Sequence, residues 1–510
     1  MSINLYGHTM RTLNNDILLY IFILNADMFS DDTDALHTTR STSQVCQSWR
    51  NLMLTTSSLW ARLIDMDTLA ERWNIHWSNE LIRRSGAALL WIRAEWTCLP
   101  TDIADFLIRV IGENWHRIQK LIVQDQSIFF DFRLARLAFG LPAPHLETFD
   151  VTLDDTVLED SEGVPRVSLF DGYAPMLRRF HLFAYAIDQR EPWLHQLHSL
   201  ELDGAYNAPE ALAVLAATPS LQELTLYTQD KDYTHPSLPV MFLPHLKSLE
   251  CTGLPRSCAT LLHHVEIPMG CSLKIYIIEL SEYIDVDETE KQLLSAVDVF
   301  RRFTRRFLQS NIFQTIHLDY RPSRSIIITG KSTFPMGCQY SISFLLNTEH
   351  ASNLLATTLR RLVLLDFSRS TTLQFSSLGP LEPSFFDCLS SLDTLSVNEK
   401  SLGYLMVIQD DMNATEKPHI LFPFLKVLDV DTNQSAVDIE VPVKFVLSRM
   451  QNGHPIATLD MTKCEPFDPT PNLDALSEAR GLKVLYKLAE TDGNFEFICG
   501  SGDPARHVTI

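Results

Sequence analysis

The feature that most constrains this chain is a six-residue phrase, apolar-x-x-apolar-x-apolar, which recurs along most of its length. The second and third apolar positions alternate with polar ones, as they do in a strand with one buried face. Helical sequence lies between copies, for example over residues 209–216. Because no strand–helix unit can bury its apolar face alone, neighbouring units are expected to stack. The copies begin at Leu89, Ile118, Leu146, Leu177, Leu197, Leu221, Leu246, Leu273, Phe313, Leu359, Leu392, Leu425 and Ile456, with an incomplete one at Leu482.

Most of these starts lie 20 to 33 residues apart. This spacing resembles the leucine-rich repeat, whose period is about 20–29 residues. The fold class implied is α/β, in which a small all-α segment precedes a leucine-rich-repeat-like β/α solenoid with a parallel sheet over residues 87–490. The alternative is an ordinary α/β sheet protein with coincidental spacing, although a barrel or doubly wound sheet needs only about eight such strands.

Two intervals are longer than the others, and each predicts an insertion. Near residues 280–310, a stripe of Leu293, Val297, Phe300, Phe303 and Phe307 predicts a helix. Near residues 320–350, two apolar runs predict a β-hairpin. The arginines of the predicted helix form either a solvated outer face or a basic contact patch; they are Arg301, Arg302, Arg305 and Arg306.

The first sixty residues have a different character. A helix is predicted from Leu13 to Leu24, capped by Asn14 or Asn15. A polar loop is expected from Asp27 to His37, followed by a second helix that begins at Ser43. Three short helices cannot bury the apolar residues of this segment among themselves, so it needs a partner surface or the rest of the chain. The alternative is that this segment is only a helical cap on the repeat array.

The segment resembles the F-box, which opens with L-P-x-E-[IL]-L-x-x-I-[FL], continues with V-C-[RK]-x-W-R and ends near L-W. Leu13 to Phe22 match the first block, Val45 to Arg50 the second, and Leu59-Trp60 the third. Residues 81–89 resemble the L-x-R-S-G-x-x-P-L segment of mushroom-type fungal F-box proteins. The chain departs from the pattern with Asn14 in place of proline, Asp16 in place of glutamate, and Gln47 in place of a basic residue.

The resemblance implies a non-catalytic substrate receptor of an SCF-type ubiquitin ligase. In that family the F-box binds a Skp adaptor, which bridges to a cullin, and the repeats bind a target protein. Two alternatives remain: a repeat-based interaction scaffold outside a ubiquitin ligase, and a hydrolase whose site the motifs do not reveal. The adaptor contacts or their supports, carried over by resemblance, are Leu13, Ile17, Leu18, Ile21, Phe22, Val45, Cys46, Trp49 and Trp60.

Composition limits the classes of partner and the cellular location that we expect for this chain. A net charge of −21 argues against binding to nucleic acid, and no apolar run approaches the length that spans a bilayer. The nine cysteines are scattered without CxxC spacing, which predicts buried free thiols and an intracellular location, cytoplasmic or nuclear. No motif predicts a metal or cofactor, and 330–333 is expected to be a turn between strands.

The predicted domain boundaries follow from these segments. They are a tail at 1–12, the F-box at 13–62, a connecting helix at 63–86, the solenoid at 87–490 and a C-terminal tail at 491–510.

Overall fold

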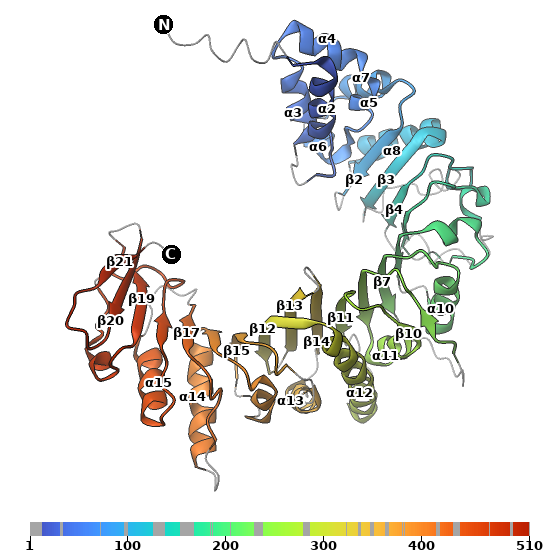
Figure 1. Cartoon of the computed structure of the whole chain (residues 1–510). Helices are drawn as coiled ribbons and strands as arrows, with labels where there is room; N and C mark the ends of the chain where they lie inside the picture. Colours follow the sequence, from blue (N-terminus) through green and yellow to red (C-terminus); the bar gives the residue numbers. More distant parts are fainter. Residues whose placement is uncertain are drawn as a thin grey trace, which may run out of the picture. The chain divides into compact units, whose positions relative to one another are not determined.

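A computed structural model shows a mixed α/β protein with a large, mostly parallel sheet (Figure 1). The chain divides into two compact units, residues 1–206 with 210–224, and 207–209 with 225–510. The residues described are 13–30, 34–71, 73–95, 100–125, 138–153, 168–183, 185, 187–203, 206–228, 238–278, 286–322, 324–334, 338–346, 351–362, 367–379, 381, 383–414, 419–431, 439–468, 470–489 and 493–508.

Unit 1 opens with a helical segment over residues 13–60. The first helix has its predicted cap, since the side-chain oxygen of Asn14 accepts a hydrogen bond from the Asp16 amide at 3.1 Å. The loop predicted to reach His37 ends earlier, because Ala35 and Leu36 are buried and begin a helix. Its helices are α2 (Asn15–Asn25), α3 (Ala35–Thr42), α4 (Gln47–Thr55) and α5 (Ser57–Trp60).

The connection between the helical segment and the sheet is more than the single helix predicted for 63–86. It contains a strand, β1 (Ile64–Asp65), and two helices, α6 (Met66–Glu71) and α7 (Ile75–Ser85). Strand β1 pairs in parallel with β2 (Leu90–Ala94). The sheet therefore begins before residue 87, because Ile64 is fully buried against the strand that follows.

Six parallel strands of unit 1 pair in sequence order, from β1 to β6. One apolar residue from each successive strand stands in the same register, and from β2 onward it is the second position of the predicted phrase. Those residues are Ile64, Ile92, Leu121, Phe149, Phe180 and Leu200. The remaining elements are α8 (Thr101–Asn114), η2 (Trp115–Arg117), β3 (Ile118–Asp125), β4 (Thr148–Leu153), η4 (Leu169–Gly172), β5 (Arg179–Leu182), η5 (Pro192–Gln196) and β6 (Ser199–Leu202).

Aromatic rings fill the interior beneath β4 and β5. Phe149 and Phe180 stack with centroids 5.7 Å apart, and Phe170 meets Phe149 edge to face at 5.3 Å. Trp193 lies 4.8 Å from Phe180. Trp193 lies in the 3-10 helix η5, whereas Phe170 lies in a turn with a left-handed φ of 60°. Burial of these large rings contributes to the stability of unit 1.

The boundary between the units falls within α10 (Ala208–Ala216) and β7 (Glu223–Thr228). In unit 2, β9 pairs in parallel with β11, and β11 with β14. Strand β13 is antiparallel to both β14 and β12. From β12 onward the pairing is parallel again, through β15, β16, β17, β18 and β19. The bounds are β9 (Ser248–Gly253), β11 (Ser272–Ile278), β12 (Ile312–Arg321), β13 (Ser325–Phe334), β14 (Gln339–Leu345), β15 (Thr372–Ser377), β16 (Thr394–Val397), β17 (Val427–Val430), β18 (Thr458–Asp460) and β19 (Lys483–Lys487).

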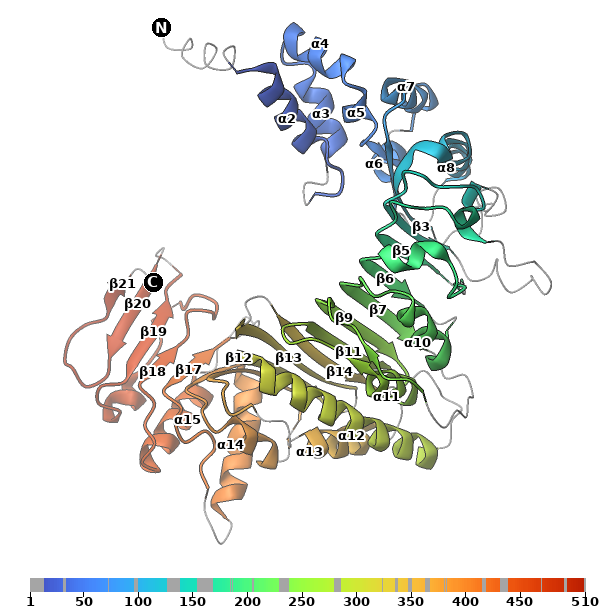
Figure 2. The ribbon, with the colours of Figure 1, turned by 45° about the vertical axis from the view of Figure 1, so that its right-hand side comes forward.

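Helices cover one face of the sheet of unit 2, where α11, α12 and α13 lie side by side (Figure 2). The helix predicted near 280–310 is α12, and its Phe300 is fully buried. No described helix has the length and apolar character to cross a bilayer. The helices are α11 (Pro255–His264), α12 (Val286–Ser310), α13 (Ala351–Leu362), α14 (Glu399–Asn413) and α15 (Glu440–Gln451), with the short elements β8 (Met241–Phe242), β10 (Val265–Glu266), η6 (Pro383–Leu389) and η7 (Asp474–Glu478).

The repeat copy predicted at Leu359 is wrong, because Leu359 and Leu362 belong to α13. A spacing of three residues fits one face of a helix as well as it fits the phrase. The strand of that repeat is β15, where Leu373 pairs in register with Ile316. The copy at Leu273 is displaced, since Leu273 itself, rather than Tyr276, stands opposite Leu249.

Two further segments differ from prediction. The predicted hairpin exists as β13 and β14, but it lies within the sheet between β11 and β12. Residues 330–333 are therefore strand rather than turn, and Gly330 pairs with Ile316. The predicted C-terminal tail contains β20 (Asn494–Ile498) and β21 (Arg506–Val508), which extend the sheet from β19 in antiparallel pairing.

Candidate functional site

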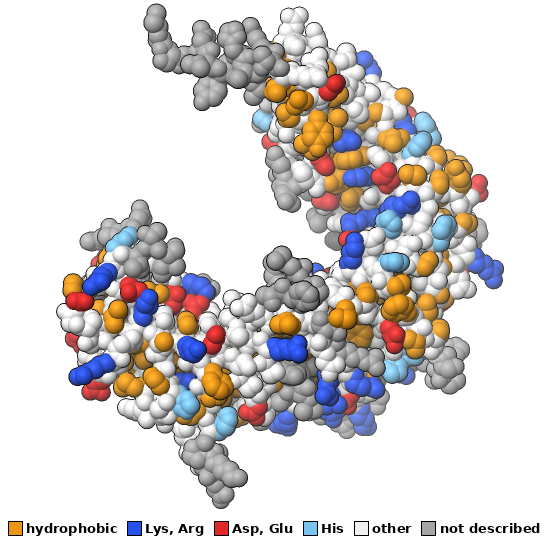
Figure 3. Space-filling view, viewed as in Figure 1, with side chains coloured by type: hydrophobic (Ala, Val, Ile, Leu, Met, Phe, Trp, Pro, Cys, Tyr) orange, Lys and Arg blue, Asp and Glu red, His pale blue; other side chains and the backbone are white. Residues whose placement is uncertain are grey.

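Helix α2 exposes apolar side chains along one face. It buries only Leu18 and Phe22 among its own residues. Ile17 is 50% exposed and Leu24 55% exposed, and their helical spacing places them on the same face. Figure 3 shows hydrophobic side chains gathered over this end of unit 1. We define the apolar stripe as Leu13, Ile17, Tyr20, Ile21 and Leu24, all of them exposed.

The residues carried over from the resemblance fall into two groups in the structure. Leu13, Ile17, Ile21, Val45 and Cys46 are exposed, so each is placed to contact a partner directly. Leu18, Phe22 and Trp60 are buried, and Trp49 is half-buried. The buried ones can act only as supports for the exposed face.

Contacts within the helical segment show how the supports work. Phe22 and Trp49 meet edge to face at 5.1 Å, which joins α2 to α4. The Trp60 indole nitrogen donates to the Met53 carbonyl at 2.9 Å, which joins α5 to the end of α4. Val45 precedes α4 rather than lying on it, because Cys46 has an extended conformation and is the N-cap. The α2 face is therefore supported from behind by the contact between the buried Phe22 and the half-buried Trp49.

The fourth block of the resemblance has a structural role. Leu81 is buried on α7, and Ser85 accepts hydrogen bonds at 3.2 Å from the buried guanidinium of Arg117. Gly86 follows with a φ of 52°, a conformation that favours glycine and ends the helix. Glu80 pairs with Arg83 first and with Arg84, and these hydrogen bonds lower its pKa to about 2. The contact between Ser85 and Arg117 fixes the end of α7 against η2 and involves no residue of the apolar stripe.

Tyr20 is 63% exposed, yet it is not among the residues carried over from the resemblance. The sequence feature that could have identified Tyr20 is helical spacing, because Tyr20 follows Ile17 by three residues and precedes Leu24 by four. Leu54, at 42% exposure near the end of α4, was also missed. No periodicity separates an exposed leucine from a buried one on so short a helix.

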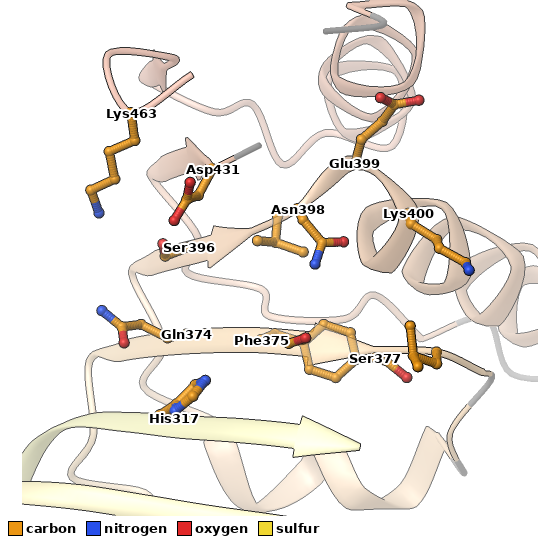
Figure 4. A pocket seen from close by; sticks show the side chains of 13 residues that line it. His317, Gln374, Phe375, Ser377, Ser396, Asn398, Glu399, Lys400, Asp431 and Lys463 are labelled. Carbon is orange, nitrogen blue, oxygen red and sulfur yellow. The ribbon is translucent and has the colours of Figure 1, made fainter. Parts of the chain in front are cut away.

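A second candidate site is a polar pocket of about 640 Å³ in unit 2 (Figure 4). His317, Gln374 and Ser396 stand in register on the adjacent strands β12, β15 and β16. The start of α14 closes one side, where the Asn398 side chain accepts from the Ser401 amide at 2.8 Å. The lining is His317, Gln374, Phe375, Ser376, Ser377, Leu378, Ser396, Val397, Asn398, Glu399, Lys400, Asp431 and Lys463.

The charges of this pocket are partly compensated. Lys463 forms an ion pair with Oδ2 of Asp429, and this hydrogen bond raises the pKa of the lysine. The other oxygen of Asp429 is buried without a hydrogen-bond partner among the described residues. Amides, hydroxyls and these charges suit the pocket to hydrogen bonding with a polar segment.

Hydrolysis would need a nucleophile held by a base, and the pocket does not show that pairing. Within the described part of the chain, no hydrogen bond joins His317 to a serine or an aspartate. In the same residues, no group of three or more His, Cys, Asp or Glu side chains is placed to hold a metal ion. The pocket displays polar side chains along the strands.

A scan against models of known protein families finds no match, and no curated protein is significantly similar in sequence.

Proposed function

We propose that this chain is the substrate-recognition subunit of an SCF-type ubiquitin ligase, in which the helical segment docks on a Skp adaptor. The observation that carries the proposal is the apolar stripe on α2, within a segment whose blocks resemble the F-box in order and spacing. Burying a large apolar side chain contributes about 1.5–3 kcal/mol, so a handful of such residues can hold a stable interface.

The sheet supports the second half of the proposal. Strands β2 to β6 and β15 to β19 each pair in parallel with the next strand along the chain. This regular order supports a leucine-rich-repeat-like solenoid, which would present one side chain per strand to a target protein. The receptor performs no chemistry, and it raises the local concentration of the target at the ubiquitin donor through the adaptor and a cullin.

Co-expression with a Skp adaptor and affinity capture tests the docking role. We expect the wild-type chain to retain the adaptor and the Ile17→Asp/Ile21→Asp variant to lose it, because two charges would enter an apolar interface. Both positions are exposed, so the variant is expected to remain folded. Val407→Asp is the matched control, since Val407 is 54% exposed on α14 in unit 2.

Retention of the adaptor by wild type and by Val407→Asp, with loss in the double variant, supports the docking role. Capture of a cullin in the same complex supports the ligase. If wild type captures no adaptor, the ligase proposal fails, and the alternative is a repeat-based interaction scaffold acting outside a ubiquitin ligase.

A further inference from the structure

One face of the unit 1 sheet carries a row of cations. Trp91, Lys120, Thr148 and Arg179 stand in register on β2, β3, β4 and β5, so their side chains share one face. Figure 3 shows Lys and Arg side chains over these strands. Arg62, just after α5, belongs to the same group because its guanidinium lies 4.4 Å from the Trp91 ring centroid. We define the cationic strip as Arg62, Lys120 and Arg179.

Aromatic rings, rather than acids, hold two of these cations. The Lys120 ammonium lies 3.8 Å from the Trp91 ring centroid and 5.1 Å from that of Phe29. Among the described residues, neither Arg62 nor Lys120 forms an ion pair with a carboxylate. A cation over an indole face is stabilised by the ring quadrupole, but its charge is not neutralised.

The electrostatic consequence is visible at Lys120. Partial burial lowers the pKa of its ammonium, the charges of Asp27 and Glu147 raise it, and the smaller effects of Arg62 and Arg179 lower it. An anion that binds beside these cations reduces the repulsion between them.

The side chains two residues further along the same strands lie on the same face, and their charges are paired with one another. Asp65 pairs with Arg93 at 2.6 Å, and His181 lies 2.8 Å from Asp150 and 3.7 Å from Glu201. That row satisfies its own charges. By contrast, Arg62 and Lys120 of the cationic strip form no ion pair among the described residues, on a chain of net charge −21, whereas Arg179 pairs with Glu223.

The indole at the centre of the strip is fixed in place. The Trp91 ring nitrogen donates to Oε1 of Gln119 at 2.8 Å, and the Gln119 amide donates to Glu147 at 2.8 Å. A ligand would therefore meet a preorganised surface, which lowers the entropy cost of binding.

We propose that the cationic strip binds an acidic segment of a partner protein, with Asp or Glu carboxylates beside Arg62 and Lys120, which both lie against the Trp91 ring, and beside Arg179. The inference deepens the proposed function, on which it rests, by assigning a chemical class to the target. A peptide fits better than a nucleic acid, because Glu147 and Glu223 flank the strip and would repel a continuous polyanion. Arg179 is already paired with Glu223 at 3.0 Å, so an incoming carboxylate would share it.

Fluorescence anisotropy of the full chain with a labelled ten-residue peptide of alternating Glu and Ser tests the proposal. We expect Arg62→Gln/Lys120→Gln to weaken binding by about tenfold, since two partly exposed charge pairs contribute about 1.4 kcal/mol in total. The matched control is Lys444→Gln/Arg506→Gln, which removes the same charge at exposed sites of unit 2. A peptide with Gln in place of Glu is expected not to bind.

Reversing the charges of the strip is expected to create binding to a peptide of opposite charge, which a misfolded variant would not show. Arg62→Glu/Lys120→Glu is expected to reject the Glu peptide and to bind its Lys counterpart. Unchanged binding in the Arg62→Gln/Lys120→Gln variant overturns the proposal, as does equal weakening in the control, which would indicate binding by net charge alone. Stronger, variant-sensitive binding of a single-stranded oligonucleotide would also overturn it. Adaptor capture by the same variants separates this result from the docking role, which the strip does not serve.

Discussion

Phe22 and Trp49 meet edge to face with ring centroids 5.1 Å apart, and this contact joins α2 to α4. It explains how a short helix can expose one apolar face and still be held firmly, because the opposite face is locked by an aromatic pair. Phe22 therefore supports the apolar stripe from inside the segment, whereas the residues of the stripe itself are exposed.

The first prediction concerns this division. Phe22→Ala is expected to destabilise the helical segment by about 3–5 kcal/mol, because Phe22 is 2% exposed and its removal leaves a cavity. Ile17→Ala, at a 50% exposed position, is expected to change stability by less than about 0.5 kcal/mol. Hydrogen exchange of peptides from residues 13–60 measures both. Equal destabilisation by the two variants would contradict the assignment of Phe22 to the interior.

Alkylation of cysteines gives a second prediction, which also tests docking. Cys46 is exposed, whereas Cys251 is buried and the neighbouring Cys258, followed by burial itself, raises its pKa well above the usual value. Because the thiolate is the reactive form, iodoacetamide is expected to modify Cys46 and to spare Cys251 in the native chain. Bound adaptor is expected to protect Cys46. Peptide mass spectrometry with and without adaptor measures this, and an unchanged rate at Cys46 would remove the start of α4 from the interface.

The third prediction is a pH dependence centred on His181. Burial lowers the pKa of this imidazole, but the hydrogen bond with Asp150 and the charge of Glu201 outweigh burial, so the pKa is raised above 6.5. A raised pKa in the folded state means that the stabilisation is complete below the unfolded pKa and is lost as the pH rises through the folded one. His181→Gln is therefore expected to cost most below pH 6.5 and progressively less as the pH rises from there through the folded pKa.

Urea unfolding of wild type and His181→Gln over a series of pH values measures that difference. His317→Gln is a suitable control, because His317 forms no ion pair with a described residue. A cost of His181→Gln that does not vary with pH would show that the imidazole contributes by packing alone.

Arg449 supplies a fourth prediction. Its guanidinium is buried and donates to the carbonyls of Leu421 and Phe422, and burial lowers its pKa to about 10, so it stays charged at neutral pH. Phe422 has a φ of 51°, which is unusual for a residue with a side chain. Arg449→Leu is expected to destabilise unit 2 by about 2–4 kcal/mol, since two buried carbonyls lose their donor.

Exposed Arg506→Leu serves as the comparison, with an expected change below about 0.5 kcal/mol. Thermal unfolding of both variants measures the difference in stability. A similar loss in the two would mean that the buried hydrogen bonds of Arg449 do not hold the Phe422 turn.

The fifth prediction contrasts two glycines. A Cβ on Gly253 would lie 2.3 Å from the Thr228 carbonyl oxygen, and its φ of 150° also favours glycine. Gly253→Ala is therefore expected to cost more than about 2 kcal/mol. Gly403 lies in α14 with nothing within 4 Å of an added Cβ, so Gly403→Ala is expected to stabilise the chain by about 0.5–1 kcal/mol. Thermal unfolding compares the pair, and effects of the same sign would refute the contrast.

The sequence by itself determined the repeated strands, because burial of one face imposes an alternation that is visible in one dimension. Leu200, Leu395 and Leu428 illustrate this, since each lies in a strand that the phrase predicted. The cap at Asn14 was equally local, because its hydrogen bond spans two residues.

Only the tertiary structure showed which segments with the same apolar spacing form a helix instead of a strand. Leu359 and Leu362 fit the phrase, yet lie on α13, because three-residue spacing is shared by helices and by this repeat. The position of β13 between β12 and β14 depends on pairings between strands that are distant in sequence. The division of the predicted contacts into the exposed Ile17 and the buried Trp60 was also beyond the sequence, since both are apolar and only packing determines which of them water reaches.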